Sequence, residues 1–215
     1  MIGRWTLFGW IAACLLAAFL WAPLVPTLGE TTRVLYFHIP SAWVTVLALG
    51  WSMVHSVLYL RRRDLGHDHQ AAAAAEIGLL FCIAATVSGS LWAKAMWGSY
   101  WNWDPRETSI FFLLLIYGAY LALRSAIEQE ERRARLSAIY SASAFVAVPF
   151  LMFVVPRIYF TLHPDPIINP QGKLDMDPRI RGVFFAMLAG FTALFFWVLS
   201  LRVRVARLER RFIEP

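Results

Sequence analysis

Long apolar runs separated by short polar segments are the main pattern along this chain. Six of them approach the length of about 17 to 25 residues that a helix needs to cross a bilayer. They occupy residues 5–24, 42–60, 71–95, 108–123, 134–155 and 183–201. The fourth run is short, so we expect its helix to begin nearer Pro105. The pattern predicts an all-α polytopic membrane protein with six transmembrane helices.

The first run resembles a secretory signal peptide in its basic start and apolar core. It lacks a small-x-small cleavage site before Pro23, and five further runs follow it. We therefore expect it to remain as the first span. No internal repeat or linker divides the sequence, which predicts one integral-membrane domain over residues 1–215.

Composition supports the same class of protein. Of the 215 residues, 59% are hydrophobic and 16% are charged, and the mean hydropathy is +0.56. A soluble domain is typically about half apolar and about a quarter charged. The excess of apolar residues is therefore that of a protein whose solvent is largely lipid.

Basic residues indicate the orientation. Thirteen of the 20 Lys and Arg residues flank the runs on the side that also holds both termini, and seven lie on the opposite side. The positive-inside rule places the richer side, with both termini, in the cytoplasm. The high isoelectric point, near 9.7, then follows from topology and gives no support to a nucleic-acid partner.

Two of the five histidines fall on the outer side, each beside a proline. His38 lies in "YFHIPSAW", just before the second run, and His163 lies in "TLHPDP", between the fifth and sixth. Both belong to outer loops at similar membrane depth, so two imidazoles can converge there on one metal ion. Cys14 and Cys82 lie within apolar runs and form no C-x-x-C motif, which argues against a thiol oxidoreductase.

The other histidines have simpler interpretations. We expect His67 and His69 on a solvated cytoplasmic loop, and His55 in a polar contact between helices. We expect Glu76, near the start of the third run, to reach the interface or to pair with an arginine of the 61–63 cluster.

An aromatic segment, "WGSYWNWDPRETS" at 97–109, lies on the same outer side as His38 and His163. An interfacial belt explains single tryptophans, but it explains poorly the group Trp92, Trp97, Tyr100, Trp101 and Trp103. On a short interfacial helix, Trp97 and Trp101 would share a face because they are four residues apart. Such a surface suits a wide, flat, apolar ligand.

The end of this segment has the signature of a helix start. Asp104 is placed as N-cap, Pro105 as first helical residue and Glu107 as the partner in a capping box. Arg106 has no such role, and a planar guanidinium can bind a carboxylate with two parallel hydrogen bonds. Aromatic planes, two axial imidazoles and an arginine for carboxylates together fit haem, which has a planar ring, two axial iron positions and two propionates.

The sequence resembles a known family at these same places. The aromatic segment is similar to the tryptophan-rich "WWD" signature of haem-handling proteins of cytochrome c maturation. "RVLYFHIPSAW" and "TLHP" resemble the histidine-bearing outer loops of the CcmC family, whose length and six spans also match. Carried over by position, the resemblance implies axial ligands at His38 and His163. It implies a platform at Trp97, Gly98, Tyr100, Trp101, Trp103, Asp104 and Arg106.

The resemblance also implies a function and partners. A CcmC-type protein holds transferable, non-covalent haem b at the periplasmic face of the bacterial inner membrane. It delivers the haem to the chaperone CcmE and works with CcmD and the ATP-binding-cassette subunits CcmA and CcmB. The chain has no nucleophile-and-base arrangement and no phosphate-binding loop of its own, so we expect no catalysis here and ATP hydrolysis in a partner.

Three alternatives stay open. The "DPRET" ending is similar to the CcsA-type haem-attachment subunits, which have longer chains, more spans and an additional histidine pair. A membrane b-type cytochrome would hold haem between histidines within helices, whereas both candidate ligands here are expected in or beside loops. A plain transporter permease would explain the spans and leave the aromatic segment without a role.

Overall fold

The computed structural model describes residues 2–163 and 176–213, and every regular element in this part of the chain is helical. The elements are α1 (Ile2–Leu20), the 3₁₀ helix η1 (Gly29–Val34), α2 (Leu35–Arg62), α3 (Leu65–Trp97), α4 (Pro105–Ser125), α5 (Glu130–Ala144), α6 (Ala147–Pro149), the π-helix η2 (Phe150–Val154), α7 (Val155–Ile158) and α8 (Pro178–Ile213).

Six helical segments of the described chain are long and apolar enough to cross a membrane, which confirms the predicted fold class. The fifth of them combines α5, α6, η2 and α7. As expected from the short fourth run, α4 begins at Pro105.

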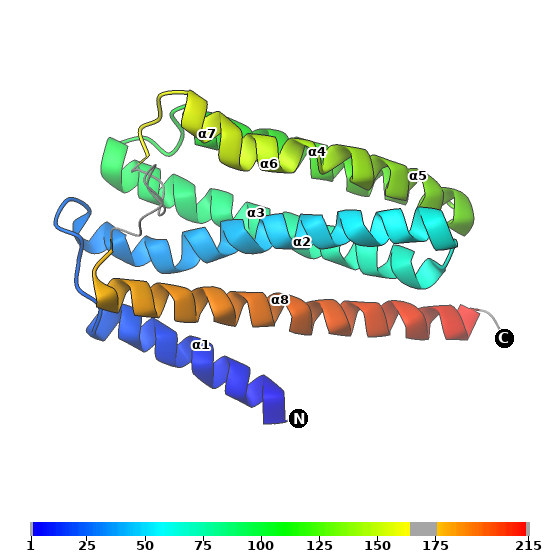
Figure 1. Ribbon diagram of the computed structural model, residues 1–215, viewed down its shortest axis with the longest axis horizontal. Helices are drawn as coiled ribbons and strands as arrows, with labels where there is room; N and C mark the ends of the chain where they lie inside the picture. The colour runs from blue at the N-terminus through cyan, green and yellow to red at the C-terminus, as the bar shows by residue number, and fades with distance from the viewer. Residues whose placement is uncertain (1, 164–175, 214–215) are drawn as a thin grey trace.

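The spans form three layers of helices with roughly aligned axes (Figure 1). The central layer is α2 beside α3, and this pair forms the most extensive helix contact. On one side α8 contacts both central helices and carries α1 on its outer surface. On the other side lie α4 and the composite span α5–α7.

Small side chains allow the two central helices to approach closely. Ala48 on α2 and Ala74 on α3 are fully buried. A Cβ added at Gly78 would lie 2.8 Å from Leu49 Cδ2, so only glycine fits there without a shift. Small residues at the contact are a common means of packing helices in lipid, where apolar burial gives no driving force.

The bundle has two chemically different ends. The site end holds η1, the start of α2, the end of α3 and the start of α4. The opposite end holds the tight α2–α3 turn, the α4–α5 connection and the C-terminal part of α8. Near this opposite end, Arg124 of α4 donates two hydrogen bonds to Asp68 of α3, at 2.7 and 2.9 Å.

The composite fifth span is irregular because of its prolines. Pro149 ends α6 and Pro156 lies in α7, and neither residue has an N–H for a helical hydrogen bond. The chain between them widens into the π-helix η2. Such widened turns often occur at functional sites, and η2 lies at the wall of the cavity described below.

Candidate functional site

A cavity of about 460 Å³ lies at the site end, bounded by α2, α3, α4, η2–α7 and α8. This volume is in the range of about 300 to 1,000 Å³ that is usual for small-ligand sites. The structure brings four of the predicted site residues to this one cavity: His38, Trp101, Arg106 and His163. Most of its other walls are apolar side chains, including Phe184 and Met152.

His38 reaches the cavity from a helix, which corrects the expectation that it lies in a loop before the second span. It lies on the first turn of α2, which begins at Leu35 and continues through Pro40. Pro40 removes only one helical hydrogen bond, because it lacks a single N–H. Arg33 fixes this start by donating hydrogen bonds to the carbonyls of Ala18, in the last turn of α1, and of Ala22, two residues after that helix ends.

A backbone acceptor fixes the His38 imidazole. Its Nδ1 lies 3.0 Å from the carbonyl oxygen of Ala85 on α3 and 3.2 Å from Ser88 Oγ. A carbonyl oxygen can only accept, so Nδ1 carries the proton in this contact. The neutral ring therefore keeps the lone pair of Nε2 for a metal ion.

His163 is held in the same tautomer by a carboxylate. Its Nδ1 lies 2.9 Å from Asp104 Oδ1. Asp104 also accepts hydrogen bonds from the Thr161 hydroxyl, at 2.8 and 2.9 Å, and from the Leu162 N–H, at 2.7 Å. Asp104 thus connects the aromatic segment to the His163 segment, in addition to capping α4 through the Arg106 N–H.

Protonation equilibria support a neutral His163. Burial lowers the pKa of His163 to about 4, assisted by the positive charge of Arg106 and by His38, although Asp104 opposes the shift. Burial alone would raise the pKa of Asp104, but hydrogen bonds from Arg106, Leu162 and Thr161 outweigh it and lower that pKa. At neutral pH the contact is therefore a hydrogen bond from a neutral imidazole to a carboxylate.

Two tryptophans enclose the His163 ring. Trp92 stacks on it with centroids 5.8 Å apart, and Trp97 meets it edge-on at 4.9 Å. The two indoles also contact each other at 4.9 Å. Trp97 thus packs against His163 and is not itself in the cavity wall.

The rest of the aromatic segment differs from the expected platform. Residues 98–104 are not helical, so Trp97 and Trp101 do not share a helix face, because Gly98 ends α3 with a left-handed φ of 78°. Trp101 packs edge-on against Trp103, while Tyr100 lies 5.4 Å from the Lys94 ammonium. Gly98, Tyr100, Trp103 and Asp104 lie outside the cavity wall. Pro164, the last residue of the "TLHP" motif, is outside the described residues.

The predicted capping box at the start of α4 is present. Glu107 Oε2 accepts the N–H groups of Asn102 and Asp104, at 2.6 and 3.3 Å. Trp103, between them, has a φ of 56°, a left-handed conformation that costs a non-glycine residue about 1–3 kcal/mol. The box holds this strained turn and thereby the position of Asp104.

The residues present fit a haem-sized planar ligand with two axial positions. Two neutral imidazoles from distant parts of the chain line one apolar cavity, and each has its Nδ1–H occupied by an acceptor. Hydrogen bonding of the second ring nitrogen to a carbonyl or carboxylate is the usual support for a histidine that binds a metal. Arg106 supplies a cation at the same cavity.

Sequence reasoning missed several residues of the site. A Cβ at Gly89 would lie 2.9 Å from His38 Cε1, so this glycine makes room for the ring. A glycine between two serines in an apolar span, as in "SGS" at 88–90, is a usable signal of such an approach. The link from Asp104 to Thr161 has no local signal, because the two residues are far apart in sequence.

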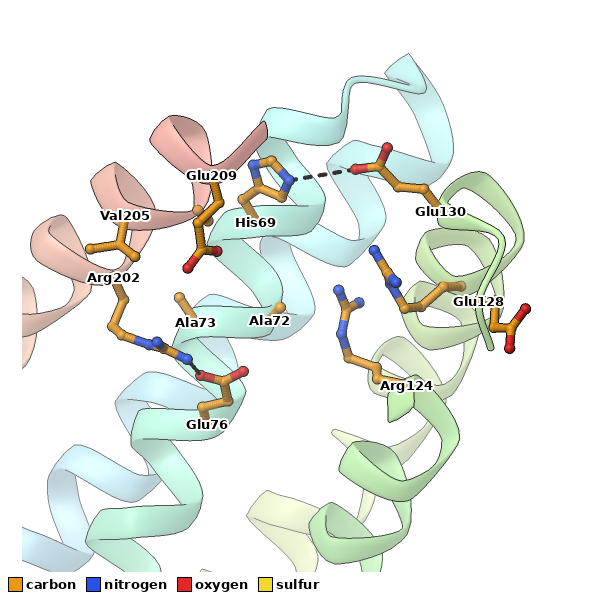
Figure 2. A pocket seen from close by; sticks show the side chains of 12 residues that line it. His69, Ala72, Ala73, Glu76, Arg124, Glu128, Glu130, Arg202, Val205 and Glu209 are labelled. Carbon is orange, nitrogen blue, oxygen red and sulfur yellow. Dashed lines mark hydrogen bonds and ion pairs between the residues drawn. The ribbon is translucent and has the colours of Figure 1, made fainter. Parts of the chain in front are cut away.

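A second cavity, of about 480 Å³, lies at the opposite end of the bundle and is lined mainly by charged side chains (Figure 2). Glu76 pairs there with Arg202 of α8. The sequence had led us to expect a pair with the arginine cluster at 61–63 instead. His69 Nε2 lies 3.9 Å from Glu130 Oε1, so His69 is not simply solvated. Charges of both signs make this cavity unsuited to an apolar ring.

The remaining histidines form a contact between helices near that end. His55 of α2 and His67 of α3 have their Nδ1 atoms 3.1 Å apart. This confirms the expected polar contact for His55 and shows that His67, too, is half-buried and not merely solvated.

Comparison with known proteins identifies the family. The sequence matches the family described as Heme exporter protein C, CcmC, over residues 4–214. The chain belongs to the CcmC family. A Heme exporter protein C of Bradyrhizobium diazoefficiens is 33% identical over 85% of this chain and 69% of its own length. One of Paracoccus denitrificans is 30% identical over 96% of this chain and 87% of its own length.

A mitochondrial relative extends the comparison. A putative cytochrome c biosynthesis ccmC-like protein of Marchantia polymorpha is 31% identical over 78% of this chain and 72% of its own length. Membership of the CcmC family assigns the chain to haem handling in cytochrome c maturation, as a multi-pass membrane protein. It also favours CcmC over the CcsA-type alternative.

Proposed function

We propose that this chain holds haem b, non-covalently, between His38 and His163 and delivers it to the haem chaperone CcmE. The observation that carries the proposal is the convergence of two imidazoles on one apolar cavity, each with its Nδ1–H donated to an acceptor. Four residues that are predicted to contact the iron or the haem ring line this cavity. They come from α2, the aromatic segment, α4 and the segment after α7.

The proposed location is the bacterial inner membrane, with the site end facing the periplasm. The excess of basic residues at the opposite end supports this orientation. CcmD, CcmA and CcmB are the proposed partners, with ATP hydrolysis assigned to the ATP-binding-cassette subunits. In this proposal the chain is a carrier and not an enzyme, and its whole length acts as one haem-handling domain.

A transfer assay tests delivery. Arg106 is proposed to fix the ring through a propionate, so Arg106→Lys, which keeps the charge and loses the planar fork, should reduce transfer to CcmE more than haem content. Arg106→Glu should reduce both. Arg179 is the matched control, because Asp177-Pro178-Arg179 opens α8 with the same tripeptide as Asp104-Pro105-Arg106 and lies outside the cavity wall. Wild-type transfer in the Arg106→Lys protein would contradict the propionate role.

One observation favours a second candidate function. His38 lies within α2, so the argument from loop ligands against a b-type cytochrome no longer applies to it. A cytochrome would retain its haem and exchange electrons in the presence of CcmE, whereas a carrier loses its haem to CcmE. The same assay therefore separates the two functions.

A further inference from the structure

Two arginines from different elements line the site cavity. Arg106 lies on the first turn of α4, and Arg157 lies on α7, directly after Pro156. The sequence had assigned no role to Arg157. Two cations at one apolar cavity are more than a ligand with a single carboxylate requires.

The structure holds Arg157 in place without neutralising it. Its Nη1 donates a 2.6 Å hydrogen bond to the carbonyl of Phe153, which also lines the cavity. A guanidinium has five N–H donors, so further donors stay available. No carboxylate of the described chain lies within ion-pair distance of Arg157. The three residues that follow it, Ile158, Tyr159 and Phe160, have exposed and largely apolar side chains.

A further donor lies on the α4 side of the cavity. Ser109 follows Arg106 by three residues, which puts both on one face of α4. It is only 2% exposed, lines the cavity, and its Oγ has no hydrogen-bond partner among the described residues. A buried hydroxyl without a partner is costly, so a ligand oxygen at this place would remove the penalty.

Glu107 restricts where a carboxylate can lie. It is the single acidic residue among the described side chains of the cavity wall, and its Oε1 is buried without a hydrogen-bond partner there. A ligand carboxylate beside this oxygen would be repelled. Ligand carboxylates are therefore directed toward the two arginines.

We propose that Arg157 binds the second carboxylate of the ligand while Arg106 and Ser109 bind the first, so that the cavity selects a planar apolar ring with two carboxylates. This inference rests on the proposed function and adds a determinant of specificity to it. It predicts that removing Arg157 deletes one of the two carboxylate interactions, whereas esterifying both carboxylates of the ligand deletes both.

The test compares haem with haem dimethyl ester in titrations of the full-length protein in detergent. Arg157→Gln should weaken haem binding about 5- to 20-fold, the effect of losing a charge-assisted hydrogen bond. The same variant should leave the affinity for the dimethyl ester within about two-fold of wild type. Arg179→Gln is the matched control and should change neither affinity, because the exposed Arg179 is not in the cavity wall.

Equal losses of affinity for haem and for its ester in Arg157→Gln would overturn the proposal, since the residue would then act on folding or on the ring. If that variant does not fold, the wild-type protein alone decides. It should prefer haem over the dimethyl ester by about 10-fold or more, with the monomethyl ester between them. Equal wild-type affinities for haem and diester would refute the two-carboxylate site while leaving haem carriage intact, whereas no binding of either would refute the proposed function itself.

Discussion

At the scale of single residues, the site depends on what each imidazole donates to. His38 donates to a backbone carbonyl and His163 to a carboxylate, which fixes both rings with Nε2 unprotonated. The two supports differ in how they can be altered. The carbonyl of Ala85 cannot be removed by substitution, whereas Asp104 can be changed without losing its capping role.

We expect Asp104→Asn to lower haem affinity about 10-fold or more, the usual effect of removing a group that orients a metal ligand. Asparagine is as good an N-cap as aspartate, so α4 should still form. Asp177→Asn is the matched control, because Asp177 caps α8 through the Arg179 N–H at 2.8 Å, as Asp104 caps α4. Haem titration of both variants is the measurement, and equal affinities would show that Asp104 only caps.

A second prediction concerns the space beside His38. Gly89→Ala would place a methyl group 2.9 Å from His38 Cε1 and should displace the ring from the Ala85 carbonyl. We expect a changed haem absorption spectrum with little change in thermal stability, because the ring can move toward the cavity. Gly118→Ala, in the middle of α4 where nothing lies within 4 Å, should leave the spectrum unaltered. Identical spectra for both variants would contradict this account of Gly89.

The pH dependence of ligation follows from the lowered pKa of His163. A histidine with its ordinary pKa of 6.5 would be half protonated at pH 6.5, and only the neutral half could bind iron, but burial lowers the pKa of His163 to about 4 and keeps it neutral above that pH. Bound iron competes with the proton and lowers the midpoint further. A pH titration of the haem spectrum should therefore show constant ligation from pH 8 to about 5.5 and loss only below about pH 4. A midpoint near 6.5 would contradict it.

The candidate ligands could be predicted because residue type alone carries much of their chemistry. His38 and His163 carry imidazoles, which can bind iron, and Arg106 carries a guanidinium, which can bind carboxylates. The second role of Asp104 could not be predicted, since its local sequence is fully explained by the helix start. Gly89 and Arg157 likewise gain their roles only from contacts between elements.

At the scale of elements, the length of the apolar runs gave the number and order of the spans, because a bilayer imposes a minimum helix length. The helix ends were less predictable. Both α2 and α3 extend beyond the predicted apolar runs at each end. The π-helix η2 follows from two prolines whose effect on the helical hydrogen bonds depends on neighbouring packing.

The Asp68–Arg124 pair joins α3 to α4, and its side chains are 3% and 14% exposed. Arg124→Gln should lower the free energy of unfolding by about 3–5 kcal/mol, because it leaves a buried carboxylate without its counter-charge. The double variant Asp68→Asn with Arg124→Gln should recover much of this loss.

Thermal unfolding in detergent is the measurement for these variants. Asp177→Asn removes the exposed Asp177–Arg179 ion pair, in which Arg179 Nε lies 3.8 Å from Asp177 Oδ1. This change should alter the free energy of unfolding by less than about 1 kcal/mol. A double variant as unstable as the single one would show that the pair itself, and not the unpaired charge, stabilises the bundle.

At the scale of the whole molecule, the two ends of the bundle have different chemistry. The site end has an apolar cavity with two histidines. The opposite end has the excess of basic residues and a charged cavity (Figure 2). Helices from all three layers are needed to form the site, since α2 and α3, α4 and η2–α7, and α8 each supply part of its wall. The proposed haem carriage therefore requires the assembled bundle.

The most direct test of the central claim is the absorption and electron paramagnetic resonance spectrum of the purified, haem-loaded protein. We predict a low-spin spectrum with two imidazole ligands. His38→Ala and His163→Ala should each abolish it, and added imidazole should partly restore it, while His55→Ala, at the opposite end of the bundle, should leave it unchanged. An unaltered low-spin spectrum in both the His38→Ala and His163→Ala proteins would contradict the account.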